Sequence, residues 1–200
     1  MSLSKNQITI KRAEIRILQL PLITTFKTGF GTVDYKETVL VCLEDSDGVV
    51  GWGEGAALSF PNYSPETAST TFLGLKEYLL PLIIGKSISC PEDLNNFYSQ
   101  VKGYHFAKTA IDCASWMIRS IKSRKPLKKI LGGKNGQIAV GESIGIKDSV
   151  EETIEEISLR LSQGYQRIKV KIKQGWDVQV VKKIRTKFPD VPLMVDANSS

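Results

Sequence analysis

The sequence predicts a mixed α/β protein in two parts: an α+β domain, then the first strands of a truncated (β/α)8-type barrel. Three observations lead to this class. Strand patterns open the first part and helical patterns follow them, whereas strands and helices alternate from residue 138 onward. Only three strand patterns occur in this second part, and a complete barrel needs eight. We therefore expect domains over residues 1–134 and 138–200.

The first domain begins with strand patterns. Residues 8–22 alternate partly between apolar and polar side chains, and a loop over 23–32 follows them. Residues 37–55 predict a hairpin around a turn at 45–48. A second loop over 56–63 leads out of this predicted sheet.

Helical patterns fill the rest of the first domain. Ser64 followed by Pro65 predicts a helix start, and Ser89 with Glu92 predicts a capping box. Residues 106–123 place six apolar side chains on one helical face, so we expect that face to be buried. The six are Ala107, Ala110, Ile111, Ala114, Ile118 and Ile121.

In the second domain, strands alternate with helices, which indicates βα units and a parallel sheet. The predicted strands cover 137–146, 165–173 and 191–198, and the predicted helices cover 149–164 and 176–188.

Composition narrows the function classes. The net charge of +6 would suit nucleic acid, a membrane surface or a small carboxylate. One histidine excludes multi-histidine metal sites, and three scattered cysteines predict no disulfide framework or zinc site. No apolar run approaches the ~20 residues of a membrane span, so we expect a soluble, cytoplasmic protein.

The strand over 165–173 carries its charge on one face. Arg167, Lys169, Lys171 and Lys173 alternate with apolar residues, so the four cations share a side. Lysines on a strand can protect an exposed sheet edge from pairing with another chain. This strand lies between two others of a βα series, where an edge position is less natural, so we expect its charged face to line a cavity.

The next strand ends in an acid and an amide. Asp196 and Asn198 share a parity at its carboxyl end, where barrel enzymes place their chemistry. Neighbouring strands would bring Lys169 and Lys171 close to Asp196. A lysine beside a second cation can act as a base, and a carboxylate suits Mg²⁺. Together they favour proton abstraction next to a carboxylate, although Asp196 alone does not complete a metal site.

These residues carry a resemblance to a known family. "VGESIGI", "RIKVKIKQGWD" and "MVDANSS" resemble the muconate-lactonizing-enzyme-like subgroup of the enolase superfamily. They are most similar to o-succinylbenzoate synthases and N-acylamino acid (N-succinylamino acid) racemases. "TTFKTGFGT", "GWGEGAALSFPNYSPET" and "KPLKKILGG" resemble the capping domain of that family.

The resemblance implies a role for each matching residue. Lys171 would be the general acid/base, and Lys169 would assist it and contact the substrate carboxylate. Asp196 would be the first of three acidic Mg²⁺ ligands, with Asn198 supporting the site. Glu142 departs from the pattern, which has a small apolar residue there. Four residues match positions that line the substrate pocket in the family: Ser143, Phe26, Leu58 and Tyr63.

Several readings stay open. The implied reaction forms an enediolate. This intermediate then either loses water to give o-succinylbenzoate, in menaquinone synthesis, or is reprotonated, which racemises an N-succinylamino acid. The alternative activity is that of a dipeptide epimerase. The expected partner is a small-molecule carboxylate substrate, and we expect no binding of nucleic acid or membrane. We also expect the protein to form a homo-oligomer. The competing classes are an inactive fragment and a module that binds nucleic acid through the basic stretch 120–134. The resemblance also implies a parent about twice as long.

Overall fold

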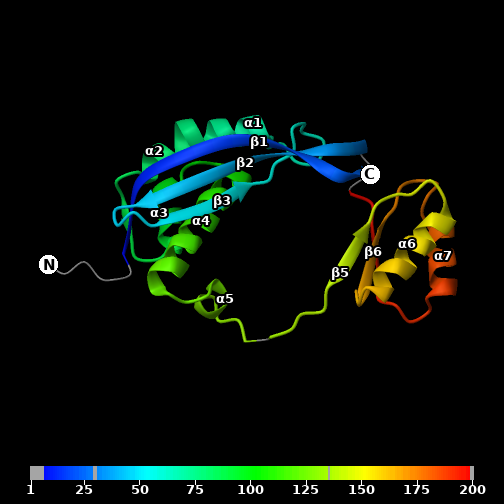
Figure 1. The fold of residues 1–200 in the computed structure, drawn as a ribbon. Coiled ribbons are helices and arrows are strands. Elements are labelled where there is room, and N and C mark those ends of the chain that lie inside the picture. Colours follow the sequence, from blue (N-terminus) through cyan, green and yellow to red (C-terminus); the bar gives the residue numbers. More distant parts are fainter. Residues whose placement is uncertain (1–6, 29–30, 135, 199–200) are drawn as a thin grey trace. The chain divides into compact units, whose positions relative to one another are not determined.

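A computed structural model describes residues 7–28, 31–134 and 136–198 (Figure 1). It divides into two compact units: Met1–Leu20 with Lys36–Lys134, and Pro21–Tyr35 with Asn135–Ser200. The sequence predicts residues 1–134 as the first domain, whereas residues 21–35 group with the second unit by their contacts. Within the described residues, no helix is both long and apolar enough to cross a bilayer.

The first unit contains a four-stranded sheet in the order β3-β2-β1-β4. The predicted hairpin over 37–55 is confirmed, with β2 and β3 paired antiparallel from Val39 opposite Gly55 to Glu44 opposite Val50. The predicted loop over 23–32 is wrong, because β1 and β2 extend through most of it. β-branched and aromatic side chains there favour extended backbone. The strands are β1 (Ile8–Thr28), β2 (Gly31–Asp45), β3 (Val50–Gly55) and β4 (Ser87–Ile88).

Two helix starts in this unit differ from their predicted positions. The first helix begins after Thr67, not at Ser64, because Thr67 and Thr70 form a capping box. The second capping box lies one residue later than predicted, and its carboxylate comes from Asp93. The helices are α1 (Ala68–Leu73), η1 (Gly74–Leu79), α2 (Leu80–Ile83), η2 (Pro91–Asp93), α3 (Leu94–Tyr98), α4 (His105–Ser123) and α5 (Leu127–Ile130).

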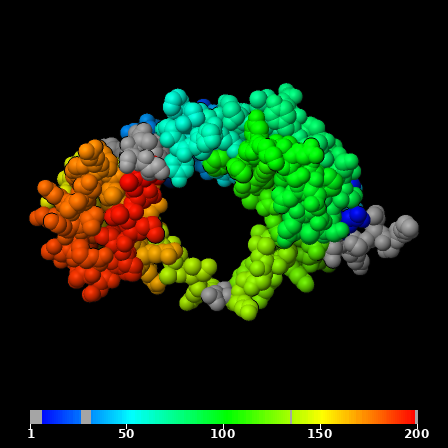
Figure 2. Space-filling view, turned by 180° about the vertical axis from the view of Figure 1, so that it is seen from behind, coloured from blue at the N-terminus to red at the C-terminus, as the bar shows by residue number. Residues whose placement is uncertain are grey.

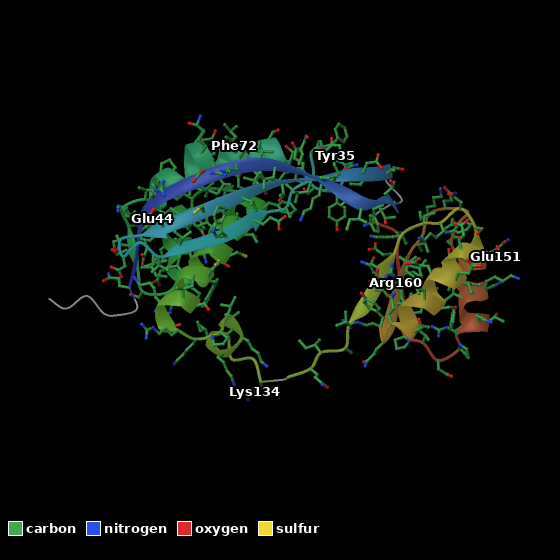
Figure 3. The ribbon with its side chains drawn as sticks, viewed as in Figure 1. Tyr35, Glu44, Phe72, Lys134, Glu151 and Arg160 are labelled. Carbon is green, nitrogen blue, oxygen red and sulfur yellow. The ribbon has the colours of Figure 1, made fainter. Side chains whose placement is uncertain are left out.

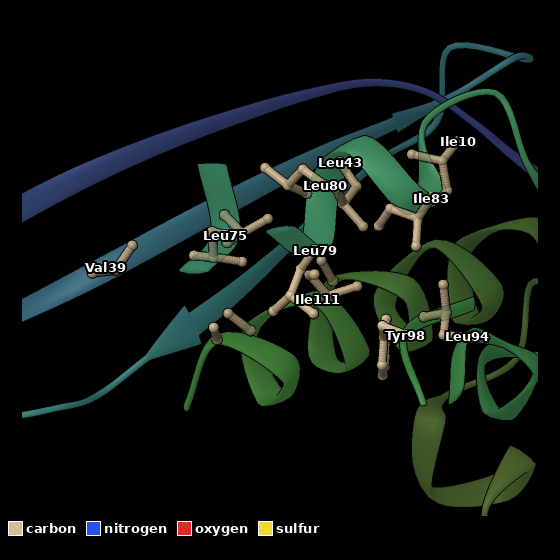
Figure 4. Close-up of a cluster of buried hydrophobic side chains, with 14 of the residues drawn as sticks. Ile10, Val39, Leu43, Leu75, Leu79, Leu80, Ile83, Leu94, Tyr98 and Ile111 are labelled. Atoms are coloured by element: carbon tan, nitrogen blue, oxygen red, sulfur yellow. The ribbon is translucent and has the colours of Figure 1, made fainter. Parts of the chain in front are cut away.

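The core of the first unit lies between the sheet and its helices. Figure 4 shows Val39 and Leu43 from β2 together with Leu79 and Ile111 from the helices. Five of the six side chains predicted on the buried face of α4 are fully buried. Ile121 is the exception, because it is 46% exposed.

Glycines on β3 allow α4 to approach the sheet closely. A Cβ atom added to Gly53 would lie 1.8 Å from the carbonyl oxygen of Ala110. Gly53→Ala should therefore force helix and sheet apart and lower the free energy of unfolding by about 1–3 kcal/mol or more. Urea unfolding measures this, with Gly136→Ala as the control, since an added Cβ there meets nothing within 4 Å. Equal stability of the two variants would contradict the close packing.

Tyr98 gives this core a pH dependence. Burial, followed by the charge of Asp112, raises the pKa of Tyr98 to about 12. The unfolded state loses this proton near pH 10, so the contribution of Tyr98 to stability is complete below pH 10 and is lost as the pH rises toward 12. Absorbance at 295 nm should show one tyrosine ionising near pH 12. Tyr98→Phe should remove that step; its persistence would contradict the assignment.

The second unit contains a parallel three-stranded sheet in the order β5-β6-β7. Figure 1 shows both helices of this unit on one side of the strands. A second hydrophobic core fills the space between the helices and the sheet. β7 is an edge strand of this sheet, with Met194 60% and Val195 44% exposed, and the red atoms of this part of the chain lie at the surface in Figure 2. The elements are β5 (Gly141–Ile144), α6 (Val150–Ser162), β6 (Arg167–Lys171), α7 (Val178–Lys187) and β7 (Leu193–Asp196).

Candidate active site

The alternation of β6 separates its apolar and cationic side chains. Ile168 and Val170 are buried in the core under the helices. Lys169 and Lys171 therefore project from the other face of the sheet. The parallel register then sets Lys171 directly beside Asp196, at the carboxyl ends of β6 and β7.

Three polar side chains converge on Lys171 or on its partner carboxylate. The Lys171 ammonium donates to Asp196 Oδ2 at 2.8 Å and to Asn198 Oδ1 at 2.6 Å. Lys169 Nζ lies 3.2 Å from the same Asp196 oxygen. Lys171 is 6% exposed, so these partners take the place of water around its charge. The structure thus brings together the four polar residues that the sequence placed at this strand end.

Asp196 is held as a carboxylate. The hydrogen bond from Lys171, the backbone N–H of Asn198 and the Lys169 ammonium keep the pKa of Asp196 well below its usual range. The Asn198 N–H donates to Asp196 Oδ1 at 2.8 Å, and Asn198 itself adopts a left-handed backbone with φ 52°. Asparagine is one of the few side chains that tolerate this conformation. The local turn therefore positions both the amide and the acid.

A hollow in this unit lies elsewhere on the sheet. It measures about 500 Å³ and is lined mainly by residues near the amino ends of the three strands, with Ser143, Lys169 and Met194 among them. Lys171 and Asp196 do not line it. We place the candidate site at the carboxyl ends of the strands because the charged contacts are there. The volume of the hollow shows only that this face of the sheet is open.

A second hollow, of about 310 Å³, brings Phe26 of β1 together with Ser143 on β5. Glu142 also lines it, but its carboxylate is engaged by Arg160 of α6 at 3.8 Å. Arg160, labelled in Figure 3, also pairs with Glu156 at 2.6 Å. The extra acid noted in the sequence is therefore part of a charged cluster with α6. Sequence reasoning missed Arg160, whose only signal was its i,i+4 spacing from Glu156.

Leu58 and Tyr63 belong to the first unit. Leu58 is half-buried and its carbonyl accepts the Ala68 N–H at 2.9 Å, whereas the Tyr63 side chain is 60% exposed. Their predicted place over a substrate stays a prediction.

The donor set at the strand ends is too small for a metal ion. Among the residues that the structure describes, no group of three histidine, cysteine, aspartate or glutamate side chains could hold one. Mg²⁺ takes oxygen ligands in near-octahedral geometry, and Asp196 supplies one such carboxylate. These residues therefore fit one part of a magnesium site and not the whole.

Comparisons with known proteins agree with this architecture. Residues 12–132 match the family model for the mandelate racemase / muconate lactonizing enzyme N-terminal domain. The o-succinylbenzoate synthase of Geobacillus kaustophilus is 44% identical over 96% of this chain and 52% of its own length. The N-succinylamino acid racemase of Thermus thermophilus is 39% identical over 96% and 52%, respectively. The chain thus spans about half the length of the curated relatives it matches.

A solved structure extends the match to three dimensions. A member of the enolase superfamily from Listeria innocua superposes with a TM-score of 0.90 at 35% identity, over 96% of this chain and 52% of that one. The family model covers more than half of the chain, and the fold and the relatives agree with it. The chain belongs to the mandelate racemase / muconate lactonizing enzyme family of the enolase superfamily.

Proposed function

We propose that this chain forms part of an enzyme that removes the proton next to a substrate carboxylate, as an o-succinylbenzoate synthase, an N-succinylamino acid racemase, or both. One observation carries the proposal: Lys171 is buried at the carboxyl end of β6 with Asp196 and Asn198 as its partners. The relatives named for these two activities support the substrate class.

Lys171 would act as the base. Its neutral amine takes the α-proton, and the carbon's electron pair moves into the carboxylate to form an enediolate. In dehydration, a β-hydroxyl then leaves with a proton and departs as water, which yields o-succinylbenzoate for menaquinone synthesis. In racemisation, a proton returns to the same carbon from the opposite face. Lys169, 3.2 Å from Asp196, would hold the substrate carboxylate beside Lys171.

We further propose that Mg²⁺ is the cofactor and that Asp196 is the ligand it takes from the described residues. When bound, such an ion supplies electrostatic stabilisation to an anionic oxygen. Because the described residues hold only this part of a magnesium site, the steps assigned to Lys171 and Lys169 do not depend on it. Ser143, Phe26, Leu58 and Tyr63 are the proposed substrate-lining residues.

A fusion protein tests the function. Joining this chain to the unmatched half of the Geobacillus kaustophilus relative would supply the length that the curated relatives have. The fusion, with Mg²⁺ in D₂O, would be incubated with N-succinyl-phenylalanine, and loss of the α-proton signal followed by NMR. Parallel samples would contain a cyclohexadiene carboxylate that dehydrates to o-succinylbenzoate, or an Ala-Glu dipeptide. Exchange or dehydration of the first two substrates supports the proposal, whereas action on the dipeptide alone would replace it with an epimerase.

A further inference from the structure

α4 begins without a capping side chain at its own N-cap position. The N-cap residue Tyr104 has a left-handed backbone with φ 53°, and its side chain makes no capping hydrogen bond. The first N–H groups of any α-helix lack partners inside the helix, so those of Phe106 and Ala107 need an acceptor from elsewhere. α4 is the 19-residue helix that packs closely on β3, so its amino end is a fixed point in the first unit.

Glu66, forty residues earlier in the chain, provides that acceptor. Its Oε2 accepts the N–H of Phe106 at 3.0 Å, and its Oε1 accepts the N–H of Ala107 at 3.0 Å. Oε1 also accepts the hydroxyl of Thr71 at 2.8 Å. A carboxylate at a helix amino end gains both hydrogen bonds and a favourable interaction with the helix dipole. Glu66 therefore joins the segment before α1 to the start of α4.

This connection closes the base of the loop over residues 56–67. The loop leaves β3 after Gly55, and the Leu58 carbonyl accepts the N–H of Ala68 at 2.9 Å. Near its other end, Glu66 is bound to α4 as described. Between these two anchors, Phe60 and Tyr63 are 68% and 60% exposed. The loop thus presents aromatic side chains from a base that is tied to a rigid helix.

We propose that Glu66 is a positioning residue, which holds the loop over 56–67 in the conformation that meets the substrate. This inference rests on the proposed function, in which Leu58 and Tyr63 line the substrate site. A loop fixed before binding costs less free energy to order on the ligand. Without the Glu66 carboxylate, only a fraction of molecules would hold the loop correctly, and the apparent affinity would be reduced to that fraction of its original value.

Hydrogen exchange on the 200-residue chain tests the clamp without any need for activity. Glu66→Gln removes the charge and leaves one N–H of α4 facing an amide NH₂. We expect amides of residues 56–67 and of the first turn of α4 to exchange about 5- to 30-fold faster, as for a lost helix cap. Asp93→Asn is the matched control, because Asp93 Oδ2 likewise accepts two backbone N–H groups, from Ser89 and Cys90. It should leave exchange in residues 56–67 unchanged.

Kinetics of the fusion protein separate positioning from general stability. Glu66→Gln should raise KM about fivefold or more and change kcat less than about twofold. Asp93→Asn should leave KM unchanged even if it lowers the melting temperature equally. Thr71→Val, which deletes one donor to Glu66 and keeps the side-chain shape, should shift KM in the same direction by less, and it replaces Glu66→Gln if that variant does not fold.

The outcomes distinguish this inference from the proposed function. If the wild-type fusion turns over none of the substrates, the proposed function fails, and the exchange experiment alone decides whether Glu66 holds the loop. Unchanged exchange in residues 56–67 of Glu66→Gln would overturn the clamp. A rise in KM of equal size in Asp93→Asn and Glu66→Gln would overturn the positioning role.

Discussion

Lys171→Ala in the fusion protein should slow α-proton exchange by about 10²- to 10⁴-fold, the usual contribution of a positioned general base. The methyl group of alanine can accept no proton, and no other described side chain donates to both Asp196 and Asn198 as Lys171 does. The fold should survive, because Asp196 keeps Lys169 at 3.2 Å and the N–H of Asn198 at 2.8 Å. NMR in D₂O measures the rate, and circular dichroism confirms the fold.

Lys173→Ala is the matched control for this experiment. Lys173 continues the alternation of the same cationic face, but β6 ends at Lys171, and the backbone of Lys173 instead forms a bridge with Trp176. Its loss should change the exchange rate by less than about threefold, as for a solvated surface charge. A comparable loss of rate in both variants would mean that net positive charge attracts the substrate and that Lys171 is not the base.

The alternation of β6 made this part of the site predictable from the sequence. Strand geometry assigns side chains to faces with a period of two, so the shared face of Lys169 and Lys171 needed no tertiary information. Their contact with Asp196 required only that β6 and β7 be neighbours in parallel register. What the sequence could not predict was the hydrogen bond from Lys171 to Asn198, because it depends on the left-handed turn at Asn198.

The misplaced helix starts in the first unit have a common physical cause. Ser64 and Ser89 are good N-cap residues, yet the caps come from Thr67 and from the Cys90–Asp93 pair. Several residues of similar propensity lie within a few positions, and packing of the following helix selects among them. The carboxylate of Glu66 could not be assigned either, since its partners lie forty residues away on α4.

Asp45→Ala should lower the free energy of unfolding by about 3–5 kcal/mol, the usual cost of breaking a buried ion pair. The Asp45 side chain is fully buried, and its Oδ2 accepts the ammonium of Lys122, whose side chain is 7% exposed. Its Oδ1 accepts the N–H groups of Asp47 and Val49, both at 2.9 Å, so it also closes the turn between β2 and β3. Alanine would leave a buried ammonium and two backbone donors short of a partner.

A double variant distinguishes this mechanism from simple loss of packing. Lys122→Met in the Asp45→Ala background removes the buried ammonium, which would otherwise keep only the exposed Asp47 carboxylate as its partner. The double variant should therefore be more stable than Asp45→Ala alone. Asp47→Ala is the matched control: its carboxylate also pairs with Lys122 but is 67% exposed, so we expect a loss of at most about 1 kcal/mol. Urea unfolding provides all three values. If the double variant proved less stable than Asp45→Ala, the buried charge would not be the main cause of the lost stability. Packing of the Lys122 stem, which methionine does not replace, would then be the dominant contribution.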